Sequence, residues 1–118
     1  MKDWLIHRIE RALEIGLGTH TFDDLLKALA AGEMQIFYNE EAVCVTEIKK
    51  TPRKVYLNIF LVAGKLKKLK ELQPEIVKFG QDQGCDFIAG GGRLGWQKVA
   101  TPGWSKRWVV HTYDLKEG

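Results

Sequence analysis

Residues 54–63, KVYLNIFLVA, constrain the fold more than any other part of the chain because this stretch is apolar at nearly every position. A strand of this kind has to be covered on both faces of its sheet. Two amphipathic helices are predicted before it, at about 1–15 and 22–31, and together they can cover only one face. The sequence therefore predicts a layered α/β structure with a further helix on the other face.

Three consecutive strands are expected to form an antiparallel meander: 34–38, 42–48 and 54–63. Asn39-Glu40-Glu41 is the predicted hairpin turn between the first two. A helix follows Gly64 and ends at Gly84, with Pro74 expected to kink it or split it in two. A strand at 85–89 then completes a strand–helix–strand step, which predicts a right-handed parallel crossover.

The last quarter of the chain is predicted to hold one more helix and one more strand. Gly90 to Gly92 forms a flexible corner, residues 93–100 a short helix, 101–103 a turn and 106–113 the final strand. The complete order is ααβββαβαβ, an α/β (α+β) arrangement whose mixed, mostly antiparallel sheet has helices on both faces. A length of 118 residues fits one domain spanning 1–118.

Composition excludes several classes of function. A net charge of +3 is too small to imply nucleic-acid binding, and no apolar run approaches the roughly 20 residues of a membrane span. Cys44 and Cys85 form no CxxC pair and lie near no histidine cluster, so no metal site is predicted. Both are expected to be reduced thiols packed in a core, which favours a cytoplasmic location.

Several charged and aromatic groups remain open to two interpretations. The lysine-rich run 65–70 is typical of a solvated helix face above a leucine stripe, but Lys65 could also face an anionic ligand. Trp96 and Trp104, with Arg93 nearby, fit either the core or a contact surface. His20, beside Thr21, is interpreted as part of a loop or helix cap.

The segment IFLVAG–helix–GCDFIAGG–RLGWQKVATPGW–strand resembles the GNAT superfamily of N-acetyltransferases. It looks most like the short GNAT-like proteins of tailed phages and prophages. The resemblance covers about residues 34–113 and rests on the order of elements, on Gly84-Cys85 before a strand, and on Gly103-Trp104 where the family usually has Gly-Phe.

This resemblance implies acetyl-CoA as cofactor, bound in the splay between the family's fourth and fifth strands. Its pyrophosphate would lie on backbone N–H groups at the start of the following helix. The matching positions here are Leu61, Val62, Ala63, Gly64 and Lys65. This loop is a degenerate form of the family's Gln/Arg-x-x-Gly-x-Gly/Ala pattern, because it is shorter and has a single glycine.

The resemblance also implies a group that deprotonates an acceptor amine. Glu47, on the Val43/Val45 face of its strand, is the best placed carboxylate, and Asn58 is expected to line the cleft. The family's frequent thiolate-protonating tyrosine aligns with Val99, which has no proton to give.

Two functions therefore remain open. The first is an acyl-CoA-dependent N-acetyltransferase, or an acyl-CoA binder, whose acceptor would be a small amine or a protein amine. The alternative is a non-catalytic GNAT-like phage protein, which would bind a phage or host protein in the virion or in the host cytoplasm.

Overall fold

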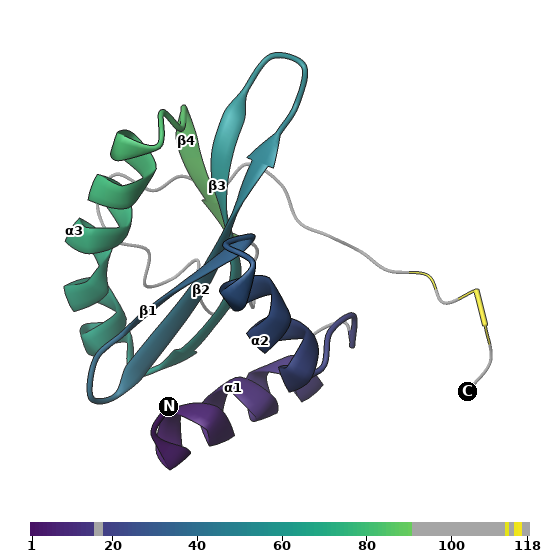
Figure 1. Cartoon of the computed structure of the whole chain (residues 1–118). Helices are drawn as coiled ribbons and strands as arrows, with labels where there is room; N and C mark the ends of the chain where they lie inside the picture. Colours follow the sequence, from purple (N-terminus) through teal and green to yellow (C-terminus); the bar gives the residue numbers. More distant parts are fainter. Residues whose placement is uncertain (16–17, 91–112, 114, 117–118) are drawn as a thin grey trace.

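A mixed β-sheet lies at the centre of the molecule and separates two layers of helix (Figure 1). The computed structural model describes residues 1–15, 18–90, 113 and 115–116. Within them the elements are α1 (Asp3–Ile15), α2 (Phe22–Ala30), β1 (Met34–Tyr38), β2 (Ala42–Lys50), β3 (Val55–Gly64), α3 (Leu66–Asp82) and β4 (Phe87–Gly90).

The sheet order in the described part of the chain is β1-β2-β3-β4. β1 pairs antiparallel with β2, and β2 pairs antiparallel with β3, which confirms the predicted meander. β3 and β4 are parallel and are connected through α3, which confirms the predicted parallel crossover. Asp86 fixes the entry into β4, because its carboxylate accepts a hydrogen bond from Val55 N at 2.9 Å and its own N–H donates to Val55 O at 2.6 Å.

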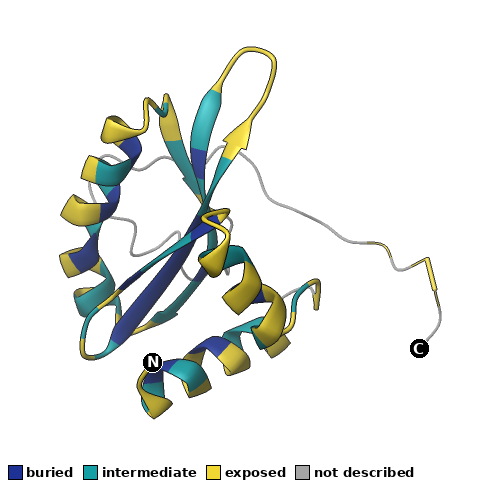
Figure 2. Cartoon of the chain, in the orientation of Figure 1, coloured by how far each residue is buried: buried dark blue, intermediate teal, exposed yellow. Residues whose placement is uncertain are grey.

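Each face of the sheet carries its own hydrophobic core (Figure 2). On one face α1 and α2 pack against alternate residues of β1, β2 and β3; the buried members are Leu5, Ile9, Leu25, Met34, Val43, Val45 and Leu61. On the other face α3 packs against the intervening residues; the buried members are Phe37, Ala42, Cys44, Leu57, Leu72 and Ile76. The prediction of helices on both faces is therefore confirmed.

The connection between α1 and α2 ends in a reciprocal cap. Thr21 Oγ1 accepts a hydrogen bond from Asp24 N, and Asp24 Oδ2 accepts one from Thr21 N. This capping box satisfies two N–H groups that a helix start otherwise leaves unpaired. It fixes where α2 begins, and so fixes the position of the residues just before it.

α3 differs from its predicted form, because it runs unbroken through Pro74 instead of splitting there. Pro74 is exposed, and so is Lys70, whose carbonyl loses its helical partner. Water can solvate that carbonyl on the outer face, while Leu72 and Ile76 hold the inner face on the sheet. The tertiary contacts thus outweigh the local cost of the proline.

Two predicted strand boundaries were also wrong. β2 continues to Lys50, and the turn is confined to the segment closed by Thr51 N donating to Lys54 O at 2.8 Å. Backbone pairing extends there without apolar side chains, so hydropathy does not reveal it. β4 begins at Phe87 instead of Cys85, because Cys85 N still donates to the Gly80 carbonyl at the end of α3.

The remaining predicted elements lie outside the described residues. These are the corner beyond Gly90, the helix at 93–100, the turn at 101–103 and most of the strand at 106–113. No helix in the described ranges is long and apolar enough to cross a membrane.

Both cysteines are free, as predicted, but their surroundings differ. Burial raises the pKa of the Cys44 thiol to about 12. Burial and the charge of Asp86 also raise the pKa of Cys85, but that side chain is only half-buried and so is accessible to a reagent. Because the thiolate is the reactive form, we expect a thiol reagent at pH 8 to label Cys85 alone in the folded protein. Mass spectrometry after timed labelling checks this. Labelling of Cys44 at the rate seen in denaturant would contradict the burial of β2.

Candidate functional site

The regular pairing of β3 is interrupted at Phe60. Val45 of β2 pairs with Leu61 and the next residue, Thr46, pairs with Ile59, so Phe60 is an extra residue without a cross-strand partner. On the other side of β3, the described pairing with β4 runs from Tyr56 opposite Phe87 to Ile59 opposite Gly90, the last described residue of β4. β-bulges of this kind re-aim side chains and end strand pairing, and they are common beside active sites.

The predicted cofactor segment follows directly from this bulge. Leu61 is buried, Val62 and Ala63 are half-buried, and Gly64 and Lys65 are exposed at the junction with α3. These five residues lead from the interior of the sheet to the first turn of a helix. Their role in cofactor binding stays a prediction, because the structure shows where they lie and not what they bind.

Gly64 makes the junction between β3 and α3 possible. Its φ is +118°, and a Cβ placed on it would lie 2.2 Å from the Glu41 carbonyl oxygen and 2.6 Å from Ala42 Cα. The end of β3 therefore lies so close to the start of β2 that only glycine fits at this position. The single glycine of this loop is required for that close contact.

The first turn of α3 presents unpaired backbone donors. Lys65 is the N-cap, and its carbonyl accepts hydrogen bonds from the N–H groups of Lys68 and Leu69. Among the described residues, the N–H groups of Leu66 and Lys67 have no partner. A helix start with free N–H groups and a partial positive charge can bind an anion such as a phosphate. This end of α3 therefore fits a phosphate group, although with fewer glycines than the family pattern has.

The lysines at this helix start are largely engaged by the β1–β2 turn. Lys65 Nζ lies 3.2 Å from Glu41 Oε1, and Lys68 Nζ lies 2.7 Å from Glu40 Oε1. The hydrogen bond from Lys68 lowers the pKa of the Glu40 carboxyl, and the same bond raises the pKa of Lys68. The Asn39 side chain joins the same contact, because its Nδ2 donates to the Lys68 carbonyl at 2.9 Å.

Only Lys67 and Lys70 of the lysine-rich run have no described ion-pair partner, and both are exposed. Lys67 belongs to the first turn of α3, whereas Lys70 lies one turn later. Leu69 of this run packs towards the sheet as expected, whereas an anionic ligand for Lys65 stays a prediction. Lys67 is the one lysine in the first turn of the described helix whose charge is available to an anion there.

The two predicted catalytic residues lie together. Glu47 and Asn58 are cross-strand partners on β2 and β3, and Asn58 Nδ2 donates to Glu47 Oε1 at 3.0 Å. Lys49 Nζ lies 3.3 Å from the same oxygen. Among the described residues, Glu47 Oε2 has no such contact. Glu47 is therefore held in place through one oxygen and can offer the other to a cationic group.

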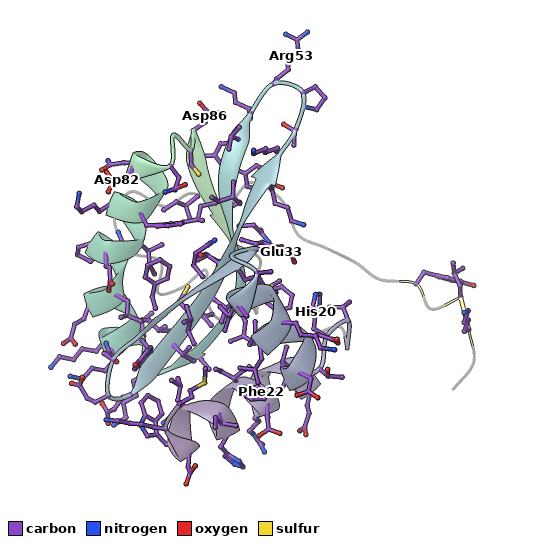
Figure 3. The ribbon with its side chains drawn as sticks, in the orientation of Figure 1. His20, Phe22, Glu33, Arg53, Asp82 and Asp86 are labelled. Atoms are coloured by element: carbon purple, nitrogen blue, oxygen red, sulfur yellow. The ribbon has the colours of Figure 1, made fainter. Side chains whose placement is uncertain are left out.

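An open groove of about 680 Å³ extends from Glu47 to the α1–α2 connection. Its polar lining comes from that connection, from α2, from the turn between α2 and β1, and from β2; these residues are Thr19, His20, Asp24, Lys27, Glu33 and Glu47. Figure 3 labels His20 and Glu33, which precede and follow α2, and both line the groove. Asp24 is ionised at neutral pH, because the hydrogen bond from Thr21 N lowers its pKa. The sequence identified Glu47 as a candidate carboxylate but did not predict the groove, because its walls come from segments that meet only in the folded chain.

Other predicted features of the site lie outside the described residues: Trp96 and Trp104 with Arg93, Gly92 and Val99. Phe60 and the carboxylates Glu40 and Glu41 are described and belong to the site, but sequence reasoning gave them no functional role. An extra residue in a strand leaves no hydropathy signal, which explains the omission of Phe60. Glu40 and Glu41 were assigned to the turn, and nothing local shows that their side chains contact Lys68 and Lys65, which lie 28 and 24 residues later.

Comparison with solved structures identifies the fold. The structure matches glucosamine-6-phosphate N-acetyltransferase from Arabidopsis thaliana with a TM-score of 0.66 and 13% identity, covering 98% of this chain and 95% of that enzyme. It matches an acetyltransferase of Trypanosoma brucei with a TM-score of 0.60 and 12% identity, covering 96% and 93%. An aminoglycoside N-acetyltransferase, solved in complex with CoA, matches with a TM-score of 0.59 and 15% identity, covering 98% and 91%.

The chain thus has the fold of the GNAT acetyltransferases, which confirms the predicted fold class. No protein-family model matches the sequence, and no curated protein matches it significantly. At 12–15% identity the structural likeness establishes the fold and leaves the activity to the residues of the site.

Proposed function

We propose that this protein binds an acyl-CoA at the end of β3 and transfers the acyl group to an amine held beside Glu47. The observation that carries this proposal is the bulge at Phe60, after which β3 leads through Gly64 into the unpaired N–H groups at the start of α3. Support also comes from the fold, since a neighbour of the same fold was solved with CoA.

Each end of the site has a distinct role in this proposal. Leu61 to Lys65 bind along the cofactor, and the N–H groups of Leu66 and Lys67 hold a phosphate with the charge of Lys67. When bound, acyl-CoA supplies an acyl group already activated as a thioester. Glu47 Oε2 attracts the acceptor as an ammonium ion, and Asn58 keeps that carboxylate oriented by donating to Oε1.

Titration of the ¹⁵N-labelled protein with acetyl-CoA tests the proposal. We expect saturable shifts of backbone amides centred on residues 61–68, because the ligand covers the N–H groups there. Lys67→Gln should weaken binding several-fold and reduce its salt dependence, since one phosphate contact is lost. Lys70→Gln is the matched control, because it removes an exposed lysine one turn further along α3. Absence of shifts at millimolar cofactor would overturn the proposal.

A second candidate function rests on the ion pairs at α3. Glu40 and Glu41 engage Lys68 and Lys65, so much of the charge that could attract a pyrophosphate is already neutralised. This observation favours a non-catalytic GNAT-fold protein, of the phage type that the sequence resembles, acting through a phage or host protein partner. The same titration separates the two candidates, because only the first requires acyl-CoA binding.

A further inference from the structure

His20 occupies a position that the helix-cap interpretation does not explain. It lies in the connection between α1 and α2, and its ring packs edge-on against Phe60 with the two centroids 4.7 Å apart. Phe60 is the extra residue of the β3 bulge and directly precedes Leu61, the first residue of the proposed cofactor segment. The imidazole therefore packs on β3 one residue before the proposed cofactor segment.

The orientation of the His20 ring is fixed from one side. Its Nδ1 lies 2.7 Å from Thr19 Oγ1, and Nε2 has no hydrogen-bond partner among the described residues. When Nδ1–H donates to the Thr19 hydroxyl, Nε2 carries the ring's lone pair and can accept a proton. Thr21 and Asp24 cap α2 without any contribution from His20, so the cap leaves the imidazole free for another role.

The groove joins this imidazole to Glu47. The charged groups facing His20 along it are Asp24, Lys27, Glu33 and Glu47, three carboxylates against one ammonium. Such a balance favours a cationic amine. Asp24 is held in the capping box, and Glu47 is bound through Oε1 by Asn58 and Lys49. Histidine is the side chain best suited to exchange protons near neutral pH.

We infer that His20 is the general base of acyl transfer, an assignment that rests on the proposed function. The bound ammonium ion first releases one proton to solvent through the open groove, which leaves a neutral amine. His20 Nε2 then takes a second proton from the nitrogen while the nitrogen lone pair forms the new C–N bond and the thioester C–S bond breaks. The electron pair of the broken bond stays on sulfur. His20 then returns its proton to that thiolate, so the products are an amide and a free thiol. Glu47 attracts the amine and Thr19 positions the imidazole.

His20→Ala tests this assignment, with His7→Ala as the matched control. His7 is an exposed histidine on α1, outside the groove. Thiol release is followed with acetyl-CoA and three acceptors: an aliphatic diamine, an amino sugar and a lysine-containing peptide. We expect His20→Ala to lower kcat about 100-fold at pH 7, as general-base loss typically does, with KM for acetyl-CoA within about twofold of the wild type. His7→Ala should behave as wild type.

Two further measurements separate a chemical role from a structural one. Added imidazole should restore activity to His20→Ala and leave the wild type unchanged, because the groove is open. The rate of His20→Ala should keep rising with pH where that of the wild type levels off. Thr19→Val keeps the histidine but removes its hydrogen-bond partner, so it should reduce kcat by a smaller factor than His20→Ala does. Because position 20 is unchanged in this variant, its effect does not depend on whether His20→Ala folds.

The outcomes distinguish this inference from the proposed function. If acetyl-CoA does not bind, both fail. If it binds and is used, but His20→Ala keeps the wild-type kcat and pH profile, the inference is overturned and the proposed function stands. If it binds and none of the three amines is acetylated, the role of His20 is overturned and only cofactor binding remains.

Discussion

Gly64→Ala is expected to destabilise the protein by about 3–5 kcal/mol. The new Cβ would lie 2.2 Å from the Glu41 carbonyl oxygen, and the residue would also have to adopt a φ of +118°. A non-glycine residue in such a backbone conformation costs about 1–3 kcal/mol, and a clash with main-chain atoms adds a comparable amount. The backbone can relieve the clash only by moving the start of β2 away from the end of β3. Urea denaturation followed by tryptophan fluorescence or circular dichroism measures the loss.

Gly84→Ala is the control for this substitution. Gly84 also has a positive φ, +74°, but a Cβ there would meet nothing within 4 Å. It therefore carries the cost of a positive φ without the clash, and a larger loss at Gly64 reports the close approach of β3 to β2 together with the larger φ there. Equal losses for the two variants would mean that this approach is looser than the structure shows.

Leu57→Ala should cost about 2–5 kcal/mol, as large-to-small changes at fully buried positions do. Leu57 is a residue of β3 with 0% of its surface exposed, and its side chain packs against α3. The contact at Gly80 of α3 is close, since a Cβ built there would be 3.7 Å from Leu57 Cδ2. Removing its side chain leaves a cavity under the helix that carries the proposed phosphate site. The free energy of unfolding from a urea titration provides the test.

Leu26→Ala is the matched change on an exposed side chain. Leu26 lies on the outer face of α2 with 39% of its surface exposed, so its truncation should alter stability by less than about 1 kcal/mol. A loss at Leu57 no larger than the loss at Leu26 would contradict the separate core between the sheet and α3.

The fold could be predicted from the sequence because its determinants are local or periodic. The two-sided apolar pattern of residues 54–63 required helices on both faces, and the leucines after Gly64 showed where the second layer comes from. The unbroken path of α3 through Pro74 could not be predicted, since it depends on which face of the helix meets solvent. The end of β2 at Lys50 was missed because backbone pairing leaves no mark on hydropathy.

The candidate site was only partly predictable. Glu47 and Asn58 were identified as polar groups in apolar strands, and the structure places them in one hydrogen-bonded pair. Their catalytic role stays a prediction. The sequence could not show that His20 lies in the same groove as Glu47, because the two residues are 27 positions apart. The packing of the His20 ring on Phe60 likewise exists only in the folded chain. The contacts of Lys65 and Lys68 with the β1–β2 turn likewise exist only in the folded chain.

The bulge at Phe60 changes which side chains β3 presents to the two layers of helix. Ile59 faces α3, whereas Leu61 faces α1 and α2, so a chain without Phe60 would keep the alternation of a regular strand. Val45 and Thr46 would then pair with adjacent residues, and the buried side chains on both sides would stay on their present faces. Phe60 is thus an added residue through which β3 presents two neighbouring side chains, Phe60 and Leu61, to the layer of α1 and α2. It also gives the His20 ring an aromatic surface to pack on.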